Sequence, residues 1–69
     1  MMVSIGYDPA RRILEIEFQS GEVYQYLDVP QDVHHALLAA PSKGRYFHAT
    51  IDGAYEHARA SRVTRRRKR

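Results

Sequence analysis

The side chains of this sequence best suited to chemistry are a pair of tyrosines and two groups of basic residues. Tyr24 and Tyr26 are separated by a single residue. Aromatic rings on a sheet face can stack on the bases of single-stranded nucleic acid. The other interpretation is that both rings fill the hydrophobic core and bring their hydroxyls to its rim. We favour the core, because the strand register predicted below puts both rings on the face of Leu14 and Phe18.

The first basic group lies in the middle of the chain. The stretch Ser42-Lys43-Gly44-Arg45 places two cations and a glycine at the predicted start of a helix, where backbone N–H groups can hold a phosphate. The stretch is too short for a P-loop. A plain capped turn between two helices explains the same residues, and we favour that interpretation. Arg59 is a further candidate for phosphate contacts.

The second basic group is the run Arg65, Arg66, Arg67, Lys68 and Arg69. Such a run can release counterions from a nucleic-acid backbone without reading its sequence, and a solubilising tail with no dedicated ligand explains it equally well. Residues 1–61 hold five Lys and Arg against eight Asp and Glu, a net charge of −3, whereas residues 62–69 hold six cations. The overall charge of +3 therefore describes the tail and not the folded surface.

No arrangement of residues in the sequence predicts catalysis, a metal site or a cofactor. His34 and His35 are adjacent, so on a helix they would point about 100° apart and could not chelate one metal together. His48 and His57 have no carboxylate or thiolate grouping around them, and the chain has no cysteine. Because no serine has the context of a nucleophile elbow, we expect a non-enzymatic module.

The elements that must position these side chains follow from hydrophobic periodicity and from turn residues. Alternation predicts strands over about residues 3–7, 12–18 and 23–29. Helical spacing after Pro30 predicts a helix over 31–40, and Ser42 predicts a short second one. Residues 54–60 fit either a fourth strand or an alanine-rich helix.

Together these elements predict a small α+β domain over residues 1–60. Its three- to four-stranded antiparallel meander would be covered on one face by one or two short helices, and the helix after Pro30 would cover the two tyrosines. Residues 61–69 are predicted to be a disordered basic tail, because such a composition cannot pack into a core.

The turn at Ser20-Gly21 decides the strand register. A two-residue loop would put Phe18 on the face of Val23, whereas a type I turn with Gly21 left-handed as a bulge would put Ile16 opposite Tyr24. We favour the bulge, because Ser-Gly lacks the residue preference of the tight primed turns. This register leaves an apolar strip on the other face, where a second copy or a partner protein could pack. The strip consists of Ile13, Val23 and Leu27.

Size and composition bound the class of protein. A chain of 69 residues with 43% hydrophobic content makes one domain with a thin core. Because cysteine is absent, self-association is the expected external support. No apolar run approaches the roughly 20 residues of a membrane span, and no leader is recognisable. We expect a cytoplasmic protein.

Several ordered stretches resemble the KTSC domain, a family named for its place at the C-terminus of some lysyl-tRNA synthetases and found also as short bacterial proteins. The resemblance covers about residues 4–57. The matching stretches are Ser4-Ile5-Gly6-Tyr7-Asp8, Leu14-Glu15-Ile16-Glu17-Phe18 with Gly21, Val23-Tyr24-Gln25-Tyr26, Val29-Pro30, Leu37-Leu38 with Ala40, Ser42-Lys43-Gly44-Arg45-Tyr46-Phe47, Ile51 and Tyr55.

The resemblance implies RNA binding, an expectation drawn from the synthetase association. A basic residue commonly follows Ile51 in the family, and Asp52 stands there in this chain, which weakens a nucleic-acid surface on the body. We therefore carry two expectations forward. The first is an accessory module that contacts RNA through phosphates, and the alternative is a protein-interaction or self-assembly module with no nucleic-acid role.

Overall fold

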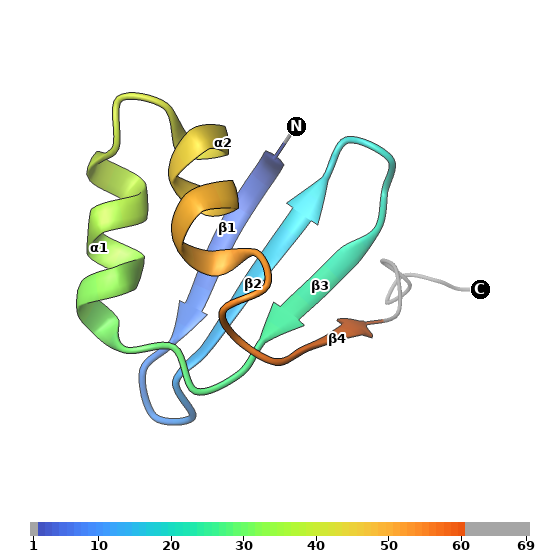
Figure 1. The fold of residues 1–69 in the computed structure, drawn as a ribbon. Coiled ribbons are helices and arrows are strands. Elements are labelled where there is room, and N and C mark those ends of the chain that lie inside the picture. The colour runs from blue at the N-terminus through green and yellow to red at the C-terminus, as the bar shows by residue number, and fades with distance from the viewer. Residues whose placement is uncertain (1, 61–69) are drawn as a thin grey trace.

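The computed structural model describes residues 2–60, which form one four-stranded antiparallel sheet with helices on one face (Figure 1). The strands lie in the order β1-β2-β3-β4, so β1 and β4 are the edges. Their bounds are β1 Met2–Asp8, β2 Ile13–Phe18, β3 Val23–Tyr26 and β4 His57–Ala60. The helices are α1 Gln31–Ala39 and α2 Lys43–Tyr46, which continues into the π-helical turn η1 Phe47–Ile51. The predicted α+β meander is confirmed, and the predicted tail over 61–69 lies outside the described residues.

The turn between β2 and β3 contains the predicted glycine bulge. Gly21 has a φ of 94°, a left-handed conformation that glycine adopts without steric cost. Its N–H donates to the Phe18 carbonyl at 2.9 Å, and the Phe18 N–H donates to the Glu22 carbonyl at 2.9 Å. The ladder that follows pairs Ile16 with Tyr24, which confirms the predicted register.

Residues 57–60 form a strand and not a helix. The chain turns at Gly53, whose φ is 85°, and β4 then pairs with the free edge of β3, placing His57 opposite Tyr26. The edge of β3 offers unpaired N–H and C=O groups, and this pairing decides between the two conformations that the sequence left open. The third strand is shorter than predicted, because Asp28, with a φ of 60°, bends the chain away from the sheet.

The end of α1 and the start of α2 each depend on the residues next to them. Ala40 is extended at the end of α1, just before Pro41, since the residue before a proline disfavours the helical conformation. Ser42 caps α2, because its hydroxyl oxygen accepts the N–H of Arg45 at 3.3 Å. Within residues 2–60, no helix has the length and apolar character needed to cross a membrane.

The core lies between the sheet and the helices, but a different helix from the predicted one covers Tyr26. The Tyr26 ring packs edge-on against Phe47 of η1, with ring centroids 5.5 Å apart. The helix after Pro30 lies instead toward the β1 edge (Figure 1), where His34 stacks on Tyr7 at 4.7 Å. The fully or nearly buried members of the core are Leu14, Ile16, Tyr26, Val29, Leu37, Phe47 and Ile51.

Candidate nucleic-acid interface

The two central tyrosines differ in burial: Tyr26 lies in the core, and stacking by the half-buried Tyr24 stays a prediction. Tyr26 is 3% exposed and belongs to the core, where burial raises its pKa, with smaller contributions from Asp52 and Tyr24. Tyr24 is half-buried, and its ring meets Phe18 edge-on at 5.7 Å. The predicted core role therefore holds for Tyr26, and the stacking role is wrong for it, because a base needs an open ring face.

The two cations of α2 are accessible. Lys43 and Arg45 are exposed, and neither forms an ion pair with another residue of the range 2–60. The Ser42 cap confirms the predicted capped turn. Phosphate binding by these two side chains stays a prediction.

The third predicted body cation is already paired. A guanidinium nitrogen of Arg59, on β4, lies 3.0 Å from a carboxylate oxygen of Glu22. The Tyr24 hydroxyl donates to the other oxygen of the same carboxylate at 3.4 Å. A phosphate at Arg59 would have to compete with Glu22. The remaining predicted contacts, Arg65, Arg66, Arg67, Lys68 and Arg69, lie outside the described residues.

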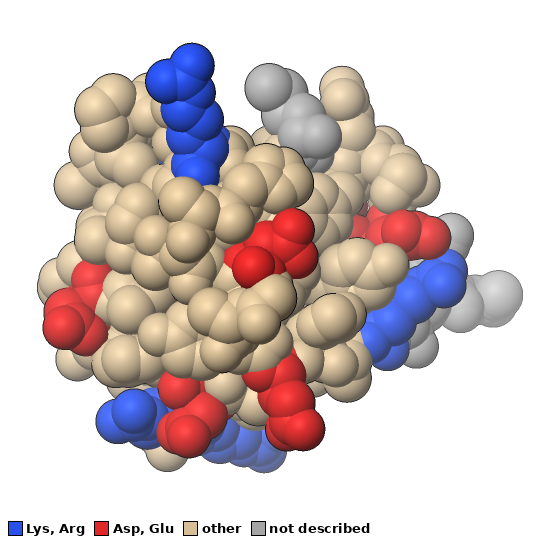
Figure 2. Space-filling view, viewed as in Figure 1, with Lys and Arg blue, Asp and Glu red and all other residues tan. Residues whose placement is uncertain are grey.

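Positive charge does not gather on the helix-covered face of the body. Figure 2 shows Lys and Arg at separate places on this face, with Asp and Glu close to several of them. Two further ion pairs in the described residues join Arg11 to Asp8 and Arg12 to Asp28, at 3.8 and 3.5 Å. Such pairing removes the continuous positive field that would attract a polyanion.

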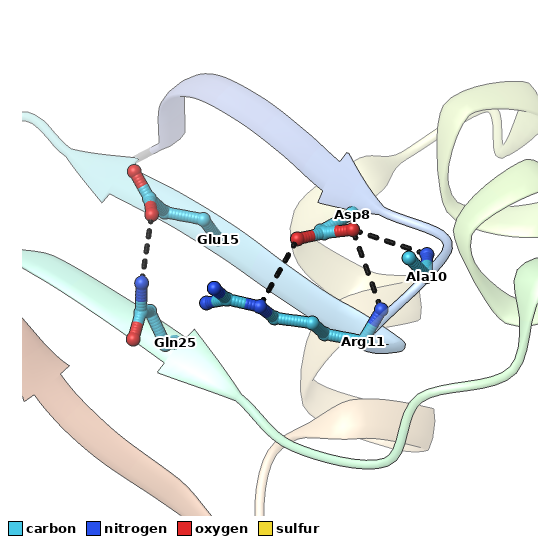
Figure 3. A network of polar contacts seen from close by, with 5 residues as sticks. All are labelled: Asp8, Ala10, Arg11, Glu15 and Gln25. Carbon is cyan, nitrogen blue, oxygen red and sulfur yellow. Dashed lines mark hydrogen bonds and ion pairs between the residues drawn. The ribbon is translucent and has the colours of Figure 1, made fainter.

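The open face of the sheet carries a small polar hollow that sequence reasoning missed. Its volume is about 220 Å³, and its polar lining consists of Asp8, Arg11, Glu15 and Gln25. The Asp8 carboxylate accepts the N–H groups of Ala10 and Arg11 at 3.0 and 3.3 Å, and Gln25 donates to Glu15 at 3.0 Å (Figure 3). The register pairs Glu15 with both Gly6 and Gln25, which is the sequence signal for this hollow. Two carboxylates line it against one cation, and that cation, Arg11, lies 3.8 Å from Asp8, so the hollow does not favour a phosphate.

The predicted apolar strip on the open face is less exposed than expected at Val23, and its role as an interaction surface stays a prediction. Val23 is only 8% exposed, while Ile13 and Leu27 are half-buried. Ala60 of β4 lies beside Val23 in the ladder. The fourth strand, which the sequence left open, thus flanks Val23 within the sheet.

The histidines have local packing partners. His48 lies 3.2 Å from a carboxylate oxygen of Asp52, and His34 stacks on Tyr7. Burial lowers the pKa of His34, and the neighbouring His35 lowers it further. Among the residues described, no three His, Asp or Glu side chains are grouped as a metal site.

The fold matches that of a solved bacterial protein. A KTSC domain protein from Yersinia pestis superposes with a TM-score of 0.84 and 43% sequence identity, covering 87% of this chain and 84% of that one. This likeness defines the class as a small α+β KTSC-type domain.

The sequence comparisons identify the family. The KTSC domain model matches residues 1–55, so the chain belongs to the KTSC domain family. An uncharacterised protein of Stutzerimonas stutzeri is 57% identical over 44 residues, which are 64% of this chain and 62% of that protein. A lysine–tRNA ligase of Nostoc sp. is 44% identical over 55 residues, which are 80% of this chain and 10% of the ligase. The chain thus spans less than two thirds of these relatives' lengths.

Proposed function

We propose that this chain is a non-enzymatic accessory module that contacts RNA phosphates in the cytoplasm. The observation that carries the proposal is the separation of charge along the chain. Residues 2–60 carry five Lys and Arg against eight Asp and Glu, whereas residues 62–69 carry six cations and no carboxylate side chain. A segment of that composition binds polyanions by counterion release. The likeness to a segment of a lysine–tRNA ligase supports RNA as the polyanion.

The contacts in this proposal are unequal. The cations after Ala60 supply most of the affinity. Lys43 and Arg45, which form no ion pair with a residue of the range 2–60, add to it. Arg59 contributes less, because Glu22 holds its guanidinium group. Phosphate contacts carry no sequence information, so we expect binding to RNA in general, with a steep dependence on salt.

The test is a filter-binding titration of the full chain with poly(U) at several KCl concentrations. In one variant, Arg65, Arg66, Arg67, Lys68 and Arg69 are all replaced by Gln. The logarithm of the binding constant falls with the logarithm of salt by about 0.7 per phosphate contacted on a single strand, so five contacts give a slope of about −3.5. We expect the variant to lose most of this slope.

The matched control removes cations from the body instead. The double variant Lys43→Gln with Arg45→Gln should retain most of the slope, because it keeps the whole basic run. Equal affinity and slope for the wild-type chain and the five-residue variant would contradict the proposal, as would the absence of binding in both.

A second candidate function, self-association, is favoured by a different surface from the predicted strip. Val3 and Leu38 are 58% and 46% exposed, and both line a hollow of about 260 Å³ with Ile5, beside edge strand β1. An edge strand offers unpaired backbone groups to a further strand. A second copy would supply one, because its own β1 has the same free edge.

A further inference from the structure

A hollow in the described part of the chain lies where α2 begins. Its volume is about 490 Å³, within the range of roughly 300–1,000 Å³ of small-molecule sites. It is formed by the end of β2, the start of β1 and the segment from Pro41 through the first turn of η1. The residues that matter are Met2, Phe18, Pro41, Lys43, Phe47 and His48.

The hollow has an apolar aromatic interior. Phe47 is 5% exposed and forms its floor, and the half-buried Phe18 ring stands against it edge-to-face, with centroids 5.9 Å apart. Met2 and Pro41 extend the apolar lining. A flat aromatic ring such as a nucleobase can pack its face against such a lining, since every base has a π-face.

The rim of the hollow is cationic and polar. Lys43 lines it and forms no ion pair with another residue of the range 2–60. The Ser42 hydroxyl oxygen already accepts the Arg45 N–H, so its own hydrogen remains available to donate. Among the described residues no carboxylate lines the hollow, although a carboxylate oxygen of Asp52 lies 3.2 Å from Nδ1 of His48. This differs from the open-face hollow, which Asp8 and Glu15 line.

We propose that this hollow binds one nucleotide of an RNA strand, with the base against Phe18 and Pro41 and the 5′-phosphate at Lys43 and Ser42. An apolar interior with a cation and a hydroxyl donor at its rim matches a ligand that joins a flat ring to a phosphate. The proposal rests on the RNA-contacting function proposed above and names a site for it on the body of the domain.

The test is an NMR titration of the isotope-labelled full chain with adenosine 5′-monophosphate. We expect saturable shifts of the Phe18 and Phe47 ring resonances and of the Lys43 and Gly44 amides. Lys43→Gln should weaken the apparent affinity about three- to fivefold, the range expected for one exposed charge contact. The matched control is Arg45→Gln, which removes the same charge from the same helix but outside the hollow, and should change the affinity by less than about twofold.

Two further ligands test the phosphate and the nucleoside parts of the nucleotide individually. Inorganic phosphate should bind more weakly than the nucleotide and leave the Phe18 ring unshifted, and adenosine without phosphate should show no sensitivity to Lys43→Gln. Equal losses in the Lys43 and Arg45 variants would overturn the proposal, because they would indicate bulk charge. Shifts with phosphate that match those with the nucleotide would overturn it as well.

The variant with Gln at positions 65–69 distinguishes this proposal from the proposed function. If that variant loses poly(U) binding and the nucleotide leaves Phe18 unshifted in the wild-type chain, the function stands and the nucleotide site fails. If that variant binds poly(U) as well as the wild-type chain and the nucleotide shifts depend on Lys43, the site stands and the tail-based function fails.

Discussion

At the scale of single residues, the neighbours of each candidate side chain, and not its type, determine whether it is available to a ligand. Tyr24 and Tyr26 are separated by a single residue, yet their surroundings differ. Tyr26 is buried against Phe47, whereas the hydroxyl of Tyr24 reaches the edge of the core and contacts the carboxylate of Glu22, which also pairs with Arg59. Lys43 keeps a free charge because no carboxylate among the described residues comes within ion-pair distance. The distinction matters for function, since an unpaired exposed cation is available to a phosphate without first breaking a contact.

We expect His34 to make the stability of the domain depend on pH. Its pKa lies below the ordinary 6.5, because of burial and then of His35, so the unfolded chain takes up a proton before the folded one does. The contribution of His34 to the free energy of unfolding is therefore complete above about pH 6.5, and it declines as the pH falls toward the lowered pKa of His34. We expect urea unfolding midpoints at pH 7.5 and 5.5 to differ less in His34→Gln than in the wild-type chain.

A second variant checks the cause of this pH dependence. His35→Gln removes the neighbouring positive charge, so the pKa of His34 should rise and the pH dependence should become smaller, while the His34 ring remains stacked on Tyr7. A His34→Gln variant with the same pH dependence as the wild-type chain would show that other groups carry the effect. Because His34 is only partly buried, the effect is expected to be small.

At the element scale, the β2–β3 hairpin organises the domain. Its bulge decides that Leu14, Ile16 and Tyr26 share the covered face, and a slip of one residue would turn these side chains to the open face. The same register places Glu15 beside Gln25 on the open face. The hairpin thus assigns the apolar face to the helices and leaves an acidic, polar face uncovered.

Replacement of Gly21 by alanine tests the bulge. An L-residue forced into the left-handed region costs roughly 1–2 kcal/mol, so Gly21→Ala should lower the free energy of unfolding by about that amount, as measured by urea denaturation. The control is Gly6→Ala in β1, where the added Cβ meets nothing within 4 Å and φ is not positive. This control should be neutral or stabilising by up to about 1 kcal/mol. A Gly21→Ala variant as stable as the wild-type chain would refute the role assigned to the bulge.

At the scale of the whole molecule, the domain has one thin core and two sheet edges. A chain of this size buries only roughly 60% of its unfolded surface, which makes further burial by association favourable. The exposed apolar groups at the β1 edge, Val3 and Leu38, are the surface that association would cover. This edge differs from β4, which carries Arg59 and its ion pair with Glu22.

Val3→Lys should prevent self-association through the β1 edge, because a lysine on an edge strand opposes pairing with a further strand. Light scattering across a range of concentrations would show a lower mean mass for this variant than for the wild-type chain. Gln25→Lys adds the same charge to the open face and should leave the mass unchanged. The reverse pattern would place the contact on the open face, and a monomeric wild-type chain at every concentration would exclude self-association.

Features that depend on local sterics and turn chemistry could be predicted from the residue types alone. The bulge at Gly21, the Ser42 cap and the end of the first helix before Pro41 all depend on a few neighbouring residues, so their types predict them. Alternation then divides the strand residues between two faces. The α+β meander and the family resemblance follow from these local features and their order along the chain.

Features that depend on contacts between distant segments could not be predicted from the sequence and are seen only in the folded domain. Residues 57–60 become a strand because β3 offers them a free edge, and Ala60 of that strand then lies beside Val23, which is 8% exposed. Phe47 and not the first helix covers Tyr26, because α1 is turned toward β1. The hollow beside Lys43 joins residues from both ends of the domain. No local pattern encodes such pairings, since their free energy arises only when segments far apart in the chain meet.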